Sequence, residues 1–148
     1  MIRIIAVGRL RDRRLADLAG DYQLRIQPLA PLGIVELKDQ TPAREARQFL
    51  TRLGPAGGNE VVIALDERGE AIDSLGLAKL LGRHGSLAFL VGGADGLTDE
   101  LRRRADRVLR LSRLTLTHEW ARVLLLEQIY RGLSILRGLP YHRGGSAG

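Results

Sequence analysis

The 148-residue chain contains no cysteine. This absence excludes disulfide bonds, thiolate zinc sites, iron–sulfur clusters and enzymes that attack through a cysteine sulfur. Long apolar runs are also absent, because no stretch approaches the roughly 20 residues that a membrane-spanning helix needs. The first apolar run, residues 2–7, is interrupted by Arg3 and ends at Gly8, so it is too short for a signal peptide. We therefore expect a soluble cytoplasmic protein.

Lysine is scarce, since Lys38 and Lys79 are the only two among 23 basic residues. We attribute this bias to genome composition, and it does not explain where the charge lies. Residues 101–148 hold ten basic and three acidic residues, a formal charge of +7, whereas residues 1–100 hold 13 and 14, a charge of −1. A basic segment of this kind favours a polyanionic partner, nucleic acid first.

Apolar runs alternate with helical periodicities along the chain. Runs rich in apolar and β-branched residues predict strands at residues 2–7, 34–37, 61–65, 87–91 and 111–116. Apolar residues at helical spacing predict helices at 12–27, 42–53, 74–82 and 119–137, and a further helix that begins after Thr98. Ser74 and Thr98 are the predicted N-caps of their helices. Residues 66–69 are predicted to form a turn. Strands that are apolar throughout are typical of burial on both faces, so the pattern predicts an α/β fold with a parallel-rich sheet flanked by helices. We expect one domain over residues 1–143 and a mobile tail at 144–148.

A glycine-rich pentapeptide, residues 92–96 (GGADG), follows an apolar strand and precedes a helix. Glycines there let backbone amides approach a ligand closely, and open α/β sheets bind ligands where their strands end. The segment is neither a G-x-G-x-x-G motif nor a P-loop. A ligand-binding loop and a tight turn without a ligand therefore both remain open.

His118 and Glu119 begin a pattern that is typical of zinc proteases, which requires a second histidine four residues after the first. Arg122 stands at that position, and the other histidines, His84 and His142, lie far away in the sequence. The sequence therefore predicts no metal site, and we interpret His84 as a turn residue.

Two arginine clusters allow a structural and a functional interpretation. Arg103, Arg107 and Arg110 recur at helical steps, which favours a solvated helix face over a phosphate-binding stripe. A second cluster follows the first strand and allows the same two interpretations, a solvated surface or a phosphate-binding one. It consists of Arg9, Arg11, Arg13 and Arg14.

The last predicted helix is apolar on more than one side, because Leu124, Leu125 and Leu126 are consecutive. This pattern indicates burial against the protein's own sheet and against a second subunit, with complete burial inside the monomer as the alternative. The triplet Tyr141-His142-Arg143 carries no functional weight from its composition alone.

Segments that carry a family resemblance are spread over nearly the whole chain. They are residues 4–10 (IIAVGRL), 65–66 (LD), 89–97 (FLVGGADGL), 111–118 (LSRLTLTH), 122–131 (RVLLLEQIYR) and 141–143 (YHR). In this order and spacing they resemble the RlmH (YbeA-like) family of SPOUT-superfamily RNA methyltransferases. Two positions depart from the family pattern: Thr117 stands where proline is common, and Gly132 where alanine is common.

The resemblance implies an α/β-knot (SPOUT) fold, in which the C-terminal part of the chain forms a deep trefoil knot, and a homodimer. It also implies that the knot loops hold S-adenosylmethionine as the cofactor. By position, the cofactor-binding residues would be Leu65, Gly92, Leu111, Ser112, Arg113, Leu114, Thr115 and Leu116. The implied activity is N3-methylation of a pseudouridine in 23S rRNA of the assembled ribosome.

Methylation at N3 requires loss of the N3 proton, to a base or with the help of a cation that favours the anion. The candidates are His118, His142 and Arg143, the last two contributed across the dimer. We expect Tyr141-His142-Arg143 to close over the target base, and Arg122 and Arg131 to contact phosphate. Two alternatives remain open: a non-catalytic RNA- or ribosome-binding protein of the same fold, and a Rossmann- or flavodoxin-like nucleotide-binding protein, which the missing phosphate motif disfavours.

Overall fold

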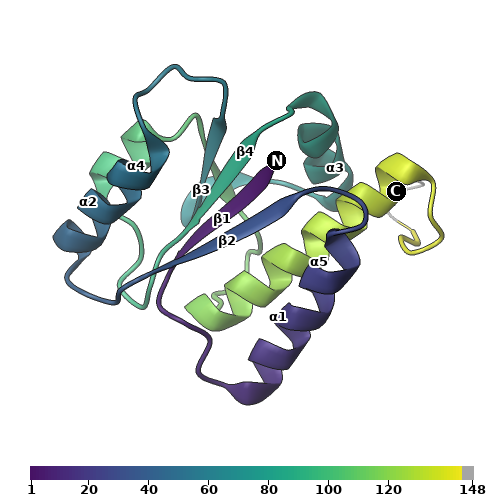
Figure 1. Ribbon diagram of the computed structural model, residues 1–148, viewed down its shortest axis with the longest axis horizontal. Helices are drawn as coiled ribbons and strands as arrows, with labels where there is room; N and C mark the ends of the chain where they lie inside the picture. The colour runs from purple at the N-terminus through teal and green to yellow at the C-terminus, as the bar shows by residue number, and fades with distance from the viewer. Residues whose placement is uncertain (145–148) are drawn as a thin grey trace.

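Five parallel strands form a single sheet in the computed structural model, which describes residues 1–144 (Figure 1). In their order across the sheet, the strands are β2 (Leu32–Leu37), β1 (Ile2–Val7), β4 (Leu87–Val91), β3 (Val61–Ala71) and β5 (Arg107–Arg110). The helices are α1 (Arg13–Ile26), α2 (Pro42–Leu53), α3 (Ser74–Arg83), α4 (Asp99–Arg104) and α5 (His118–Arg137). The predicted α/β fold with a parallel sheet flanked by helices is confirmed. Residues 145–148 of the predicted mobile tail lie outside the described residues.

The helices cover the two faces of the sheet in a fixed pattern. Helices α1, α3 and α5 pack together on one face, and α2 and α4 lie on the other (Figure 1). The connections through α1 and α3 step toward the β2 edge, whereas those through α2 and α4 step toward the β5 edge. Because crossovers between parallel strands keep one hand, opposite steps place their helices on opposite faces. The strands are therefore buried on both sides.

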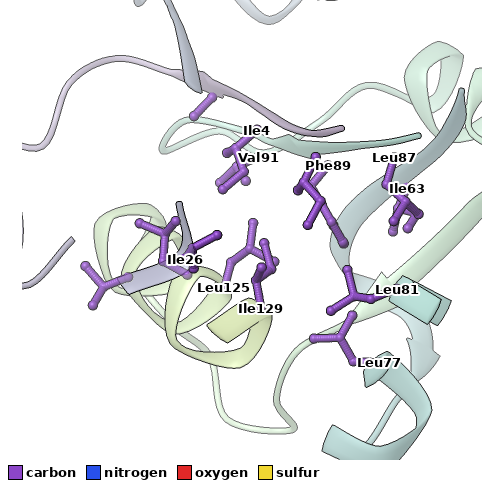
Figure 2. Packing of buried hydrophobic residues seen from close by; sticks show 14 of the residues in the cluster. Ile4, Ile26, Ile63, Leu77, Leu81, Leu87, Phe89, Val91, Leu125 and Ile129 are labelled. Atoms are coloured by element: carbon purple, nitrogen blue, oxygen red, sulfur yellow. The ribbon is translucent and has the colours of Figure 1, made fainter. Parts of the chain in front are cut away.

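The core explains the continuous apolar runs. In β4, Phe89 faces the layer of α1, α3 and α5, while Leu90 faces the layer of α2 and α4, and both are fully buried. Figure 2 shows Phe89 directed toward Leu125 and Ile129 of α5. Burial of a side chain of this size stabilises the fold by about 1.5–3 kcal/mol. A parallel strand between two helical layers needs apolar residues at every position, which is the pattern of residues 87–91.

Strand β3 is longer than predicted. The turn expected at residues 66–69 is wrong, because β3 continues to Ala71 and its pairing with β5 shifts register between Leu65 and Glu70. A Cβ atom on Gly69 would lie 2.7 Å from the carbonyl carbon of Leu109, so this close approach of the two strands requires glycine. The extra length is thus decided by contact with a strand far along the chain.

The helical arginine stripe is also wrong. Helix α4 ends at Arg104, and Arg107 and Arg110 lie on β5. The cause is a long-range contact: the backbone N–H of Val62 donates to the Asp106 carboxylate at 2.7 Å, and the Asp106 N–H donates to the Val62 carbonyl at 2.8 Å. These two bonds draw the chain into the sheet directly after α4.

Two smaller expectations are corrected. Residues 111–116 form a loop rather than a strand, in which the Ser112 hydroxyl accepts from the N–H of Leu114 at 2.9 Å. Asp73, not Ser74, caps α3, and the Ser74 hydroxyl donates instead to Gln128. No helix within residues 1–144 is long and apolar enough to cross a membrane.

Candidate functional site

A cavity of about 570 Å³ opens where β4 and β5 end, beside the middle of β3. Its walls are residues 65–68, which lie within β3 where its pairing with β5 shifts register, and the segments 91–97 and 110–118, which begin at the ends of β4 and β5. The chain leaves β3 toward α3 on one face and β4 toward α4 on the other. In doubly wound sheets, such a divergence between neighbouring strands leaves a crevice at their carboxyl ends that binds ligands.

The glycine pentapeptide forms one wall of this cavity. Gly93 and Gly96 make an isolated bridge, in which the Gly96 N–H donates to the Gly93 carbonyl at 3.0 Å, and Gly96 has a φ of +75°. A Cβ atom on Gly92 would lie 2.8 Å from the Gly96 carbonyl carbon. Glycine is thus required for the tight turn, and the bare backbone of this turn faces the cavity. The tight turn is confirmed, and ligand binding by this loop stays a prediction.

Arg102 of α4 joins two walls of the cavity. It donates to the Asp66 carboxylate at 2.8 Å, to the Leu97 carbonyl at 2.7 Å, and to Asp99. Asp99 and Asp66 raise the pKa of Arg102, and Arg102 lowers the pKa of Asp99. The sequence did not single out Arg102, because it is one of three consecutive arginines, Arg102–Arg104. Only its contact with Asp66 in the folded structure distinguishes it from the other two.

Most of the predicted cofactor residues meet at the cavity. Seven of the eight line it: Leu65, Gly92, Leu111, Ser112, Leu114, Thr115 and Leu116. Arg113 lies in the same loop but is exposed and does not line the cavity. The structure thus brings together three segments that are separated by up to 51 positions in the sequence, from Leu65 to Leu116. The role of these residues in binding the cofactor stays a prediction.

His118 lines the cavity at the beginning of α5. The residue before it, Thr117, has a φ of −64°, a value that proline also adopts, and its hydroxyl accepts from the N–H of Trp120 at 3.3 Å. Thr117 therefore keeps the extended entry that proline would impose and adds a helix cap. The departure from the family pattern preserves the position of His118.

The terminal triplet lies against α1 and α5, away from this cavity. Tyr141 donates to the Glu127 carboxylate at 3.1 Å, and its hydroxyl lies 3.1 Å from that of Tyr22. Burial, with help from Tyr22 and Glu127, raises the pKa of Tyr141, so that its hydroxyl keeps its proton. Arg131 donates to Nδ1 of His142 at 3.1 Å and also pairs with Glu127 at 2.7 Å.

The structure does not bring His118 and His142 of one chain together. Glu127, which holds the triplet, stands nine residues after His118 on α5, or about 14 Å along the helix at roughly 1.5 Å per residue. Arg143 is exposed beside His142. The three catalytic candidates of a single chain are therefore divided between two places.

Arg122 is placed differently from the expectation. Its side chain is 9% exposed, donates to the Gly8 carbonyl at 3.0 Å and pairs with Glu36. The residue thus fastens α5 to the ends of β1 and β2 instead of facing solvent. Burial and pairing with Gly8 and Glu36 favour this structural role over the expected contact with phosphate, although Nε of Arg122 has no partner within residues 1–144.

Sequence comparisons relate the chain to known proteins. A family model described as "Predicted SPOUT methyltransferase" matches residues 1–142. A protein named ribosomal RNA large subunit methyltransferase H from Syntrophotalea carbinolica is 44% identical, and the alignment covers 95% of this chain and 97% of that protein. A protein of the same name from Prochlorococcus marinus (strain MIT 9303) is 47% identical, with 96% and 92% covered.

Two solved structures share the architecture. A probable methyltransferase from Bordetella pertussis Tohama I superposes with a TM-score of 0.53 at 16% identity, covering 89% of this chain and 93% of that one. The SpoU methyltransferase AviRb from Streptomyces viridochromogenes gives 0.50 at 13% identity, covering 94% and 61%. Because the sequence identities are only 16% and 13%, these two structures show a shared fold and nothing more.

Proposed function

The chain belongs to the ribosomal RNA large subunit methyltransferase H family of SPOUT methyltransferases, and we propose that it methylates N3 of a pseudouridine in 23S rRNA. The methyl donor in this proposal is S-adenosylmethionine, and the substrate is the assembled ribosome, which places the enzyme in the cytoplasm. The observation that carries the proposal is the cavity beside β3 and at the ends of β4 and β5, lined by the glycine turn and by seven of the eight expected cofactor residues.

The residues around the cavity suit this cofactor. A volume of about 570 Å³ lies within the roughly 300–1,000 Å³ of small-molecule sites. Leu65, Leu111 and Leu116 offer apolar surfaces for the adenine ring, and the bare backbone at Gly92 permits close approach. The cofactor supplies an electrophilic methyl group when bound. The protein's contribution is then to align the attacking nitrogen with that group at near-attack distance.

The proton on N3 of the substrate base must leave during the reaction. His118 lines the cavity and is one candidate to accept it. The other candidates are His142 and Arg143 of the partner subunit, with the arginine favouring the anion by its charge. We infer a partner because the triplet of the same chain is held about 14 Å further along α5.

A homodimer would cover apolar surface that one chain leaves open beside the cavity. Trp120 of α5 is 53% exposed and Leu114 of the adjoining loop is 77% exposed. Side chains of this size are common in buried interfaces. In such a dimer, α1 and α5 of one subunit would present Tyr141-His142-Arg143 to the cavity of the other, with Arg131 and the triplet against RNA.

The trefoil knot belongs to the same proposal. Loop 111–117 leads from the edge strand β5 to α5, and α5 crosses under the sheet to pack on both α1 and α3. In a knot, this loop would pass through another loop of the chain, and this would hold residues 111–116 rigidly around the cofactor. Rigidity there lowers the entropic cost of binding.

Calorimetric titration with S-adenosylhomocysteine, the demethylated product, tests the proposal. We expect saturable binding, followed by methylation of assembled 70S ribosomes in preference to free large subunits. Absence of binding would overturn the proposal and favour a non-catalytic ribosome-binding protein of the same fold. Binding together with methylation of another nucleotide would overturn the substrate assignment while leaving the methyl donor in place.

A further inference from the structure

Arg110 ends strand β5 in the wall of the cavity. Its Nε atom is buried and has no hydrogen-bond partner within residues 1–144. Buried donors normally have an acceptor, because the protein must replace the water that such a group loses. Arg110 thus lies in the cavity wall with a donor that lacks an acceptor within residues 1–144.

The other arginines of the cavity are already engaged. Arg102 is shared between Asp66 and Asp99, and Arg68 lies 3.8 Å from Asp99. Arg107, on the same strand as Arg110, pairs with Glu70 at 3.3 Å and does not line the cavity. Among the described residues, no carboxylate lies within ion-pair distance of Arg110, so its charge is free to meet an anion in the cavity.

We propose that Arg110 binds the α-carboxylate of the methionine half of the cofactor. The inference rests on the proposed function, since it requires this cofactor. Of the ionised groups of S-adenosylmethionine, the carboxylate alone is negative, whereas the sulfonium and the ammonium would be repelled by a guanidinium. Arginine presents parallel donors that match the two oxygens of a carboxylate.

The burial of Nε favours the cofactor over an RNA phosphate as the partner. A phosphate of the ribosome would reach the open rim of the cavity, where guanidinium groups are surrounded by water. The Nε of Arg110 is instead closed off from solvent in the wall. Arg110 therefore belongs to the wall of the cavity rather than to a surface that a phosphate of the ribosome would meet.

The test compares two ligands that differ only in the carboxylate: S-adenosylhomocysteine and its decarboxylated form. Calorimetry on the full-length wild-type protein should show at least tenfold tighter binding of S-adenosylhomocysteine, which corresponds to about 1.4 kcal/mol. In Arg110→Gln this preference should fall to near one, through loss of affinity for the carboxylate-bearing ligand alone. Arg110→Lys, which keeps the charge, should retain part of the preference.

Arg107→Gln is the matched control, because it removes a paired arginine from the same strand, and it should keep the full preference. Equal weakening of both ligands by Arg110→Gln would overturn the inference, since it would indicate a distorted cavity. Unchanged binding of both, with weaker binding of ribosomes, would overturn it in favour of a phosphate contact. If the wild-type protein bound neither ligand, the proposed function itself would fall, and this inference with it.

Discussion

The hydroxyl oxygens of Tyr22 and Tyr141 lie 3.1 Å apart, although 119 positions separate them in the sequence. Because Tyr141 donates its proton to Glu127, Tyr22 is the donor in the bond between the two hydroxyls. The ring of Tyr130 meets that of Tyr141 edge to face, with centroids 4.6 Å apart. Helix α1 thus helps to fix the terminal triplet on α5.

Tyr22→Phe should loosen this triplet. The variant loses one hydrogen bond, with a net cost to stability of about 0.5–1.5 kcal/mol, and leaves the cavity intact. We expect the methylation rate to fall several-fold with unchanged affinity for S-adenosylhomocysteine, and faster hydrogen exchange at residues 139–143. Tyr130→Phe is the control, because its hydroxyl makes no hydrogen bond within residues 1–144. Equal effects of the two variants would contradict the assigned role of Tyr22.

Gly92→Ala should damage the cofactor site selectively. The added Cβ would lie 2.8 Å from the Gly96 carbonyl carbon and 3.0 Å from its oxygen, so the turn must shift. We expect the affinity for S-adenosylhomocysteine to fall at least tenfold, or about 1.4 kcal/mol. Gly85→Ala makes the same chemical change at a position where, apart from its two chain neighbours, no atom of residues 1–144 lies within 4 Å of the added Cβ, and it should bind normally. Unaltered binding by Gly92→Ala would show that the turn does not shape the site.

Arg122→Met tests the structural role given to that arginine. The change leaves the Gly8 carbonyl without its donor, while Glu36, whose side chain is 43% exposed, can return to water. We expect a loss of about 1–3 kcal/mol in the free energy of unfolding, measured by urea denaturation. Arg25→Met, which breaks an exposed pair with Asp21, should cost under about 1 kcal/mol. If Arg122→Met kept full stability but bound ribosomes more weakly, the result would favour a phosphate contact for Arg122 over the structural role.

Glu45 gives the fold a dependence on pH. It is 5% exposed and accepts from the N–H of Gln40 at 2.8 Å, and burial raises the pKa of its carboxyl, with Asp39 and Asp95 adding to the rise. The folded state therefore holds this proton more tightly than the unfolded chain. The stability that Glu45 contributes is present below its unfolded pKa and is lost as pH rises through its folded pKa.

Glu45→Gln should consequently raise the free energy of unfolding at pH 7 by about 1 kcal/mol, because the amide removes a buried charge yet still accepts from Gln40. The gain should vanish below the unfolded pKa of about 4.3. Urea denaturation of variant and wild type at both pH values measures this difference. Asp17→Asn, at an exposed position of α1, should show no such dependence. A gain that persisted at low pH would have another cause.

The sequence was sufficient for features that depend on local pattern. The apolar runs at 87–91 and 61–65 predicted strands buried on both faces, Thr98 was correctly interpreted as the cap of α4, and the glycine pentapeptide was placed at the end of a strand. Each of these follows from a period or a side chain acting on its own backbone neighbours. The family resemblance likewise rested on motifs readable in order along the chain.

Tertiary structure decided what depends on partners distant in the chain. Asp106 draws the chain into the sheet through Val62, 44 positions away, and so turns an expected helical stripe into β5. Arg122 is buried because Glu36 and the Gly8 carbonyl meet it at the ends of β2 and β1, whereas Nε of Arg110 meets no acceptor within residues 1–144. Strand order brings Gly92 and Leu116 to one cavity. The sequence around a charged residue does not show whether its side chain is solvated, paired or without a partner. The energy of the charge is set by the groups that folding brings against it.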